Sequence, residues 1–179
     1  MALSKQQKID VEKVLRDNLR KKFQTYKPEP ASMPFHTRLL GKDRMALFSF
    51  IHSLNTNFGT SIFEPVAKEL ARGRFKKVET HIEAGTQISE SAQSEIQKII
   101  DGLTTAKTTP AKIKEISEIR KVCQKGEVKK IKPTLVDILL EDKSGELFLF
   151  DIKTAKPNVG GFKEFKRTLL EWVATVLVE

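Results

Sequence analysis

Apolar positions repeat with a helical period over much of this chain. Between residues 4 and 23 they recur three or four apart, a spacing that places them on one face of a helix. The same period predicts helices over about 42–55, 89–103, 111–124 and 162–178. The side chains expected to pack inward from these helices are Val11, Val14, Leu15, Leu19, Phe23, Leu47, Phe50, Ile51, Leu54, Ile96, Ile99, Ile100, Leu103, Ile113, Ile116, Ile119, Cys123, Phe162, Phe165, Leu169, Trp172, Val173 and Val176.

Two segments have the composition of strands instead. Residues 135–141 and 146–153 are rich in Val, Ile, Leu and Phe, as half-buried strands are, and a polar turn separates them. Residues 75–83 fit a helix or a strand, and the prolines of residues 25–35 predict a loop or arm. In the second strand, the side chains expected in the core are Phe148, Phe150 and Ile152.

The register of this hairpin depends on its turn. A three-residue loop favours glycine at its last position, which is Gly145 here. With that loop, Asp142 pairs with Glu146, and Asp137 lies directly opposite Asp151. A two-residue loop would shift the pairing by one residue and break this arrangement, so the register is an assumption.

Asp137 and Asp151 are carboxylates placed among strand residues, where a charge is costly unless it is paired or binds a metal. Opposed side chains share one face, with Cβ atoms about 5 Å apart, and two carboxylates at that distance repel unless a cation lies between them. Lys153 shares the face of Asp151 because strand side chains alternate. The set suits Mg²⁺-dependent phosphodiester cleavage, with Asp137, Asp151 and the Ile152 carbonyl as metal ligands and Lys153 beside the attacking water. The alternative is an ordinary solvated strand face.

The sequence allows two interpretations of the role of Glu64. It follows Ser61 by three residues at the start of a helix that is expected to run to about Ala71, with Pro65 tolerated near its beginning. That spacing is typical of a capping box. Glu64 could equally be a third acid that approaches the metal, directly or through water.

The composition favours a polyanionic partner. The 179 residues include 32 Lys plus Arg against 23 Asp plus Glu, a net charge of +9, which favours nucleic acid ahead of an anionic membrane. A merely soluble or ribosomal-type basic protein is the alternative. The candidates for contact with DNA phosphates, whose binding should weaken steeply with salt, are Lys129, Lys130, Lys132, Lys156, Lys163, Lys166 and Arg167.

Several classes of protein are not indicated. The single cysteine, Cys123, excludes an internal disulfide and fits a reducing cytosol. No apolar run has membrane-spanning length, and no glycine-rich phosphate loop, zinc pattern or Ser-His-Asp set is visible. We therefore expect one domain over residues 1–179, in which residues 1–34 form a helix and a Pro-rich arm and the core spans about 42–178.

Two levels of family resemblance follow from these residues. Pro133-x-x-x-Asp137 followed by Asp151-Ile152-Lys153 resembles the PD-(D/E)xK nuclease superfamily, with the proline displaced from its usual place just before the first acid. Three longer stretches are similar to the TdeIII-like type II restriction endonucleases: Phe35-His36-Thr37-Arg38-Leu39-Leu40-Gly41, Phe58-Gly59-Thr60-Ser61-Ile62-Phe63-Glu64-Pro65-Val66-Ala67 and Phe150-Asp151-Ile152-Lys153-Thr154-Ala155-Lys156-Pro157.

The resemblance implies a restriction-endonuclease-like α/β fold, a small mixed sheet with the catalytic hairpin 135–153 flanked by helices. It implies a homodimeric, Mg²⁺-dependent, type II site-specific deoxyribonuclease that cuts double-stranded DNA at a short sequence, such as a GC-rich palindrome like GGNCC. The expected setting is the prokaryotic cytoplasm and a restriction–modification system with a cognate DNA methyltransferase that is not a binding partner. It also favours Glu64 as an active-site acid over a cap.

One departure from this resemblance keeps rivals open. Related chains continue past the helix at 162–178, so we expect a C-terminally shortened copy and leave open whether its last core strand is missing. The rivals are a basic DNA-binding module, a catalytically dead remnant of such a nuclease, and a repair-type nuclease. A binding module should bind DNA whether or not Asp137 and Asp151 are present and should not nick it with Mg²⁺. Uniform fragments from a plasmid would favour restriction, and structure-dependent nicking would favour repair.

Overall fold

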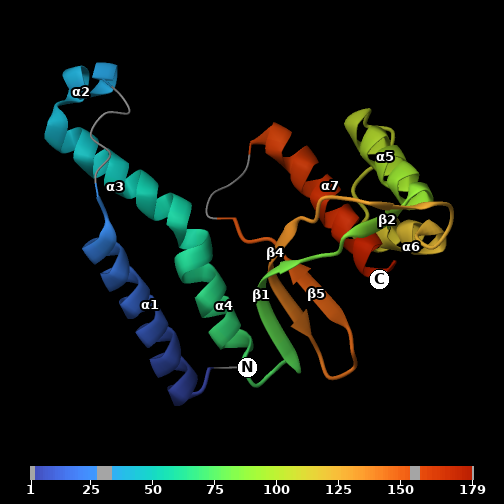
Figure 1. Cartoon of the computed structure of the whole chain (residues 1–179), viewed down its shortest axis with the longest axis horizontal. Coiled ribbons are helices and arrows are strands. Elements are labelled where there is room, and N and C mark those ends of the chain that lie inside the picture. Colours follow the sequence, from blue (N-terminus) through green and yellow to red (C-terminus); the bar gives the residue numbers. More distant parts are fainter. Residues whose placement is uncertain (1–2, 28–33, 154–157, 179) are drawn as a thin grey trace. The chain divides into compact units, whose positions relative to one another are not determined.

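The computed structural model describes residues 3–27, 34–153 and 158–178, and it confirms a mixed α/β fold with small antiparallel sheets (Figure 1). Its elements, in chain order, are α1 (Lys5–Thr25), α2 (Pro34–Leu40), α3 (Lys42–Phe58), the π-helical turn η1 (Gly59–Phe63), α4 (Glu64–Ala71), β1 (Lys77–Glu83), β2 (Gln87–Ser89), α5 (Glu90–Thr104), α6 (Lys112–Val122), β3 (Val128–Lys130), β4 (Leu135–Glu141), β5 (Leu147–Phe150) and α7 (Val159–Val176).

The chain divides into two compact units. Unit 1 comprises Met1–Thr80 and Asp137–Thr154, and unit 2 comprises His81–Val136 and Ala155–Glu179. Each unit is described by itself below. The expectation of one nuclease domain remains a prediction.

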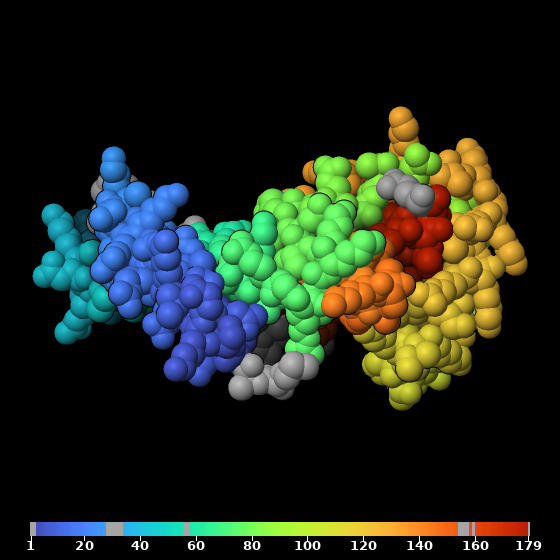
Figure 2. Space-filling view, turned by 90° about the horizontal axis from the view of Figure 1, so that it is seen from below, coloured from blue at the N-terminus to red at the C-terminus, as the bar shows by residue number. Residues whose placement is uncertain are grey.

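In unit 1, α1 begins where the sequence predicts a helix. The Ser4 hydroxyl accepts from the Gln7 amide, and the Gln7 side chain accepts from the Ser4 amide in return, which completes a capping box. Near the other end of α1, the Phe23 and Tyr26 rings contact the ring of Phe50 on α3, with centroids 5.1 and 4.9 Å apart. The C-terminal end of α1 accordingly lies beside α3 (Figure 2, blue and teal). Phe23, expected to be buried, is 63% exposed.

The burial predicted for two side chains of α3 is also wrong. Leu47 and Ile51 were predicted to face the core but are 60% and 47% exposed, while Phe50 and Leu54 are half-buried. The loop expected over residues 25–35 is also wrong at its end, because Pro34 begins α2. Proline suits the first turn of a helix, where its missing N–H has no partner in any case. The remainder of the expected arm, residues 28–33, lies outside the described residues.

The strand order β1-β4-β5 forms a three-stranded sheet, so the ambiguous segment 75–83 is a strand. The β4–β5 hairpin has the register predicted from a three-residue loop, with Ile138 opposite Phe150 and Glu141 opposite Leu147. The Asp142 amide donates to the Glu146 carbonyl at 3.0 Å, which closes the turn.

The Asp142 side chain holds this turn in place. One of its carboxylate oxygens accepts from the Ser144 hydroxyl (2.6 Å), the Ser144 amide (2.8 Å) and the Glu146 amide (2.9 Å). The Ser144 hydroxyl and the Glu146 amide lower the pKa of Asp142, because they stabilise the charged form. Gly145 has φ +86°, which L side chains rarely adopt, so glycine at this position selects the three-residue loop.

A small core lies between α4 and the sheet in unit 1. Ala71 packs with Ile138 and Leu140, and partly buried Ala67, Phe75, Val78, Phe148 and Ile152 surround them. Two expectations need correction here. Strand β5 ends at Phe150 instead of reaching residue 153, and Phe150 itself is 46% exposed.

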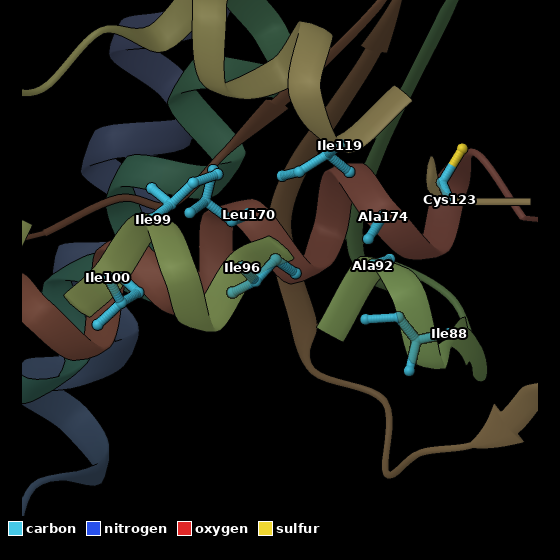
Figure 3. Packing of buried hydrophobic residues seen from close by; sticks show 9 residues of the cluster. All are labelled: Ile88, Ala92, Ile96, Ile99, Ile100, Ile119, Cys123, Leu170 and Ala174. Carbon is cyan, nitrogen blue, oxygen red and sulfur yellow. The ribbon is translucent and has the colours of Figure 1, made fainter. Parts of the chain in front are cut away.

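In unit 2, helices α5, α6 and α7 enclose the larger core (Figure 3). It contains Ile96, Ile99 and Ile100 of α5 with Ile119, Cys123, Leu170, Ala174, Ala92 and Ile88, so the predicted faces of α5 and Cys123 are confirmed. The predictions for Ile113, Phe162 and Leu169 are wrong, because these side chains are 86%, 51% and 39% exposed. The β2–β3 pair was not predicted at all.

Candidate active site

The candidate site begins with the two aspartates of the hairpin. Extending the observed register one residue beyond Ile138 and Phe150 places Asp137 opposite Asp151. Hydrogen-bonded pairs alternate along the ladder from the pair that closes the turn, so this pair is of the non-hydrogen-bonded type. Such pairs bring Cα atoms to about 4.5 Å and their side chains closest together. This extension goes one residue past the end of β5, so the neighbouring position of the two carboxylates remains a prediction.

A side chain ends this ladder. In a continued ladder the Ile152 amide would donate to the carbonyl of Val136, but it donates to Asp137 Oδ2 at 2.6 Å instead. A bond to a charged acceptor is stronger than the neutral bond it replaces. The carboxylate of Asp137 thus takes the place of the strand carbonyl, which explains why β5 stops at Phe150.

Lys153 lies against the second aspartate. Its ammonium nitrogen is 2.6 Å from a carboxylate oxygen of Asp151, whose side chain is 16% exposed, while that of Lys153 is 40% exposed. Lys153 and Asp151 are therefore in direct contact, and Asp137 binds the amide of Ile152, the residue between them.

Glu64 is the first residue of α4, and the capping-box interpretation of it is wrong. The helix continues from α3 through η1, and the Glu64 amide donates to the Gly59 carbonyl five residues earlier. The residue before α4 is Phe63, which makes no side-chain capping bond. Ser61 therefore lies within a continuous helix and has no terminus to cap.

The side chain of Glu64 is only 5% exposed. It occupies the same helical stripe as Ala67 and Ala71, three and seven residues later, and these two pack against the sheet. Glu64 therefore belongs to the sheet-facing side of α4, in the same unit as the hairpin. A buried carboxylate is costly unless it is hydrogen-bonded, paired or bound to a metal.

The donor chemistry fits Mg²⁺. Among the residues that the structure describes, no three His, Cys, Asp or Glu side chains gather closely enough to form a metal site by themselves. Mg²⁺ does not need such a cage, since it is usually bound through one or two carboxylates, with waters and substrate phosphate completing an oxygen shell. Asp137 and Asp151 could hold it, together with the carbonyl of Ile152.

One comparison with known proteins decides the family. The model of the type II restriction endonuclease HinfI matches residues 3–179. The chain belongs to the HinfI family of type II restriction endonucleases. No curated protein and no solved structure matches it.

Membership of the HinfI family makes the chain a nuclease of the hydrolase class whose substrate is DNA, with a restriction-endonuclease-like fold. The matching family is that of HinfI, whereas the three longer stretches resembled the TdeIII-like enzymes; both are type II restriction endonucleases. No described helix combines the length and the apolar character needed to span a bilayer.

The basic residues expected to contact DNA differ in their surroundings in this HinfI-family chain. Lys166 forms an ion pair with Glu115, whose side chain is 6% exposed, and the Ala111 amide donates to the same carboxylate at 3.1 Å. Arg167 donates to the Gln97 side chain at 2.6 Å. Sequence reasoning missed the Glu115–Lys166 pair because 51 residues separate its members.

The other predicted basic positions are more open. Lys129 lies 3.2 Å from Glu90 and is half-exposed, and Lys163 lies on the exposed side of α7. Lys130 and Lys132 are exposed as well, whereas Lys156 lies outside the described residues. Contact with DNA remains a prediction for each of these positions.

Proposed function

We propose that this chain hydrolyses phosphodiester bonds in both strands of duplex DNA at a short specific sequence, with Mg²⁺ as the cofactor. Membership of the HinfI family supports the class of reaction. The observation that supports the choice of site is the hairpin, in which Asp137 accepts the amide of Ile152 and Lys153 contacts Asp151. The family does not favour a DNA-binding module without catalysis or a repair-type nuclease.

In this mechanism Asp137 and Asp151 would hold the ion, together with the carbonyl of Ile152. Mg²⁺ bound there would polarise the scissile phosphate and lower the pKa of the attacking water. Lys153 places a positive charge next to that water and offsets the negative charge that grows on the phosphate. Its contact with Asp151 fixes the position of the ammonium group before the substrate binds.

Glu64 has a supporting role in the proposal. Its burial on the sheet-facing stripe of α4 suits a carboxylate that orients water or a second ion on the hairpin side. The arrangement is that of the PD-(D/E)xK nucleases, to which we assign the chain. The closer likeness to TdeIII-like enzymes also stays a proposal.

The proposal extends to the partners. The exposed lysines Lys129, Lys130, Lys132 and Lys163 would contact DNA phosphates, and the enzyme would act as a homodimer that offers one hairpin to each strand. A cognate DNA methyltransferase would protect the host sequence without binding the nuclease. The family match gives no support to a GC-rich target, so the sequence has to be read from the cleavage products.

The test is digestion of mixed plasmid DNA by the purified chain. With Mg²⁺ we expect discrete fragments that share one terminal sequence, and with EDTA we expect none. Lys153→Ala should slow cleavage by about 100-fold or more, as the loss of one transition-state contact does, while the Kd for DNA stays nearly unchanged. Lys143→Ala, at the exposed turn of the same hairpin, is the matched control and should cut normally.

Three results would contradict the proposal. They are fragments that persist in EDTA, a Lys153→Ala variant as fast as the parent, and DNA binding with no nicking at any Mg²⁺ concentration. The last result would favour a binding module. Cleavage that follows branched or nicked structures instead of sequence would favour a repair enzyme.

A further inference from the structure

Helix α3 is apolar on two opposite sides. On one side Phe50 contacts the rings of α1, and Ser49 and Ser53 accept hydrogen bonds from Tyr26 (2.8 Å) and Lys22 (2.8 Å). At 100° per residue, Leu47, Phe48 and Ile51 form a second stripe, centred about 160° away from the first. Helix α1 therefore covers one side of α3, and the side chains on the other side are exposed in the part of the chain that the structure describes.

The neighbouring helix α2 carries further exposed apolar side chains. Leu47, Phe48 and Ile51 are 60%, 51% and 47% exposed. Helix α2 packs against α3 after a bend at Gly41, whose φ is +82°. It adds three further exposed side chains, and we call the whole set the α2–α3 apolar surface: Phe35 (72%), Leu39 (70%), Leu40 (41%), Leu47, Phe48 and Ile51.

The size of this surface matches one side of a protein interface. With about 200 Å² for each large apolar side chain, its six members expose on the order of 700 Å². Monomeric proteins rarely expose a contiguous apolar area above a few hundred Å². A standard interface buries about 800 Å² on each partner and has an apolar centre with aromatic side chains. The periodicity of α3 also predicts burial for Leu47 and Ile51, which the described part of the chain does not provide.

We propose that a second copy of this chain docks on the α2–α3 apolar surface and forms a two-fold symmetric dimer. This rests on the proposed function, since an enzyme that cuts both strands needs two hairpins. A two-fold interface uses one surface twice and needs no second complementary patch elsewhere on the molecule. The edge of this surface on α3 carries Asp43 next to Arg44, so both signs of charge are present there, as self-complementary pairing requires.

Sedimentation velocity of the whole chain, without DNA or metal, tests this proposal. We expect the mass of two chains at micromolar concentration. Leu47→Glu combined with Ile51→Glu should give the mass of one chain, because burying four unpaired carboxylates weakens self-association by about 100-fold or more. Ile113→Glu, which alters the 86% exposed Ile113 of α6 in the same way, is the matched control and should leave the dimer intact.

Cross-linking separates lost docking from lost folding. Ile51→Cys and Ile113→Cys each add one accessible thiol, since the native Cys123 is buried. A short bis-maleimide should join two copies of the first variant and not of the second, and both should keep the circular dichroism of the parent. Asp137→Asn should remain dimeric, so that a failure of catalysis and a failure of docking give different results.

Three outcomes would overturn the proposal. The first is a parent chain that sediments as a monomer at 50 µM or so, well above the Kd range of specific complexes. The second is a double-glutamate variant that stays dimeric. The third is a monomeric parent that floats with vesicles containing anionic lipid. The second would place the interface elsewhere. The third would assign the surface to a membrane.

Discussion

Asp137 accepts the backbone amide of Ile152 at 2.6 Å, in place of the carbonyl that a continued β-ladder would offer. The side chain therefore has two tasks that can be separated. It ends the strand through a hydrogen bond, and in the proposed mechanism it contributes negative charge to the metal. An amide side chain can perform the first task but not the second.

Asp137→Asn should therefore keep the hairpin and lose cleavage. The asparagine carbonyl can still accept from Ile152, so we expect unfolding in urea close to that of the parent and a cleavage rate lower by about 100-fold or more. Asp137→Ala should lose both, with a further cost of about 1–3 kcal/mol in the free energy of unfolding from the unmade bond. Equal stability of the two variants would show that the bond to Ile152 does not hold the strand end.

Glu64 can be tested against a neighbour of similar burial. Glu64→Gln should reduce cleavage by about 10- to 100-fold, the usual cost of losing a group that orients metal ligands, and should raise the Mg²⁺ concentration needed for half-maximal rate. Glu69→Gln on the same helix is the control, because Glu69 is also buried and pairs with Arg72 at 3.2 Å. If both variants respond alike to Mg²⁺, Glu64 has only a structural role.

The Glu115–Lys166 pair gives a prediction about stability. Lys166→Ala leaves a carboxylate buried with only the Ala111 amide as partner, so we expect a loss of about 3 kcal/mol in the free energy of unfolding, measured in urea. Replacing both residues by methionine should restore most of it, since no charge is then left unpaired. Lys163→Ala removes an exposed lysine three residues earlier and should leave stability unchanged. A similar loss for both alanine variants would contradict a special role for the pair.

Glu171 on α7 gives a prediction about pH. Burial raises the pKa of Glu171, partly opposed by Arg167 and assisted by the nearby charge of Glu164. A raised pKa in the folded state means that the contribution of this group to stability is complete below its ordinary value of 4.5 and is lost as the pH rises through the folded value. Glu171→Gln should therefore melt at a higher temperature than the parent at pH 7, and the difference should shrink towards pH 4. A constant difference across this range would exclude titration of Glu171 as its cause.

The part of the site that could be predicted from the sequence is the part set by local chemistry. The three-residue turn depends on Gly145 and Asp142, which lie within a few residues of the bonds they make, so the register could be derived correctly. The early end of β5 could not be derived, because a side chain on the partner strand, Asp137, captures the amide of Ile152. The spacing of apolar residues cannot indicate that a side-chain carboxylate will replace a backbone carbonyl as the acceptor of a hydrogen bond.

Other differences arise from elements whose patterns are too short or ambiguous. Strands β2 and β3 have three residues each, and Lys129 and Lys130 give β3 no apolar alternation to recognise. For α3, periodicity identifies the helix but cannot tell whether its own chain or another molecule covers Leu47 and Ile51. A sequence pattern predicts that a side chain is covered, but it does not identify the segment or molecule that covers it.

The π-helical turn at Gly59–Phe63 adds one residue to a helix that otherwise runs on from α3 into α4. Because the wide turn takes up that residue, loss of one codon within it would return the helix to regular α geometry, whereas loss of one codon in α3 would rotate everything after it by about 100° relative to α3. The stripe of Glu64, Ala67 and Ala71 would then turn as one, away from the sheet. The orientation of an acid in this fold thus depends on a count of residues several positions away from it, and an insertion or deletion there could inactivate a relative whose acidic residues are all still present.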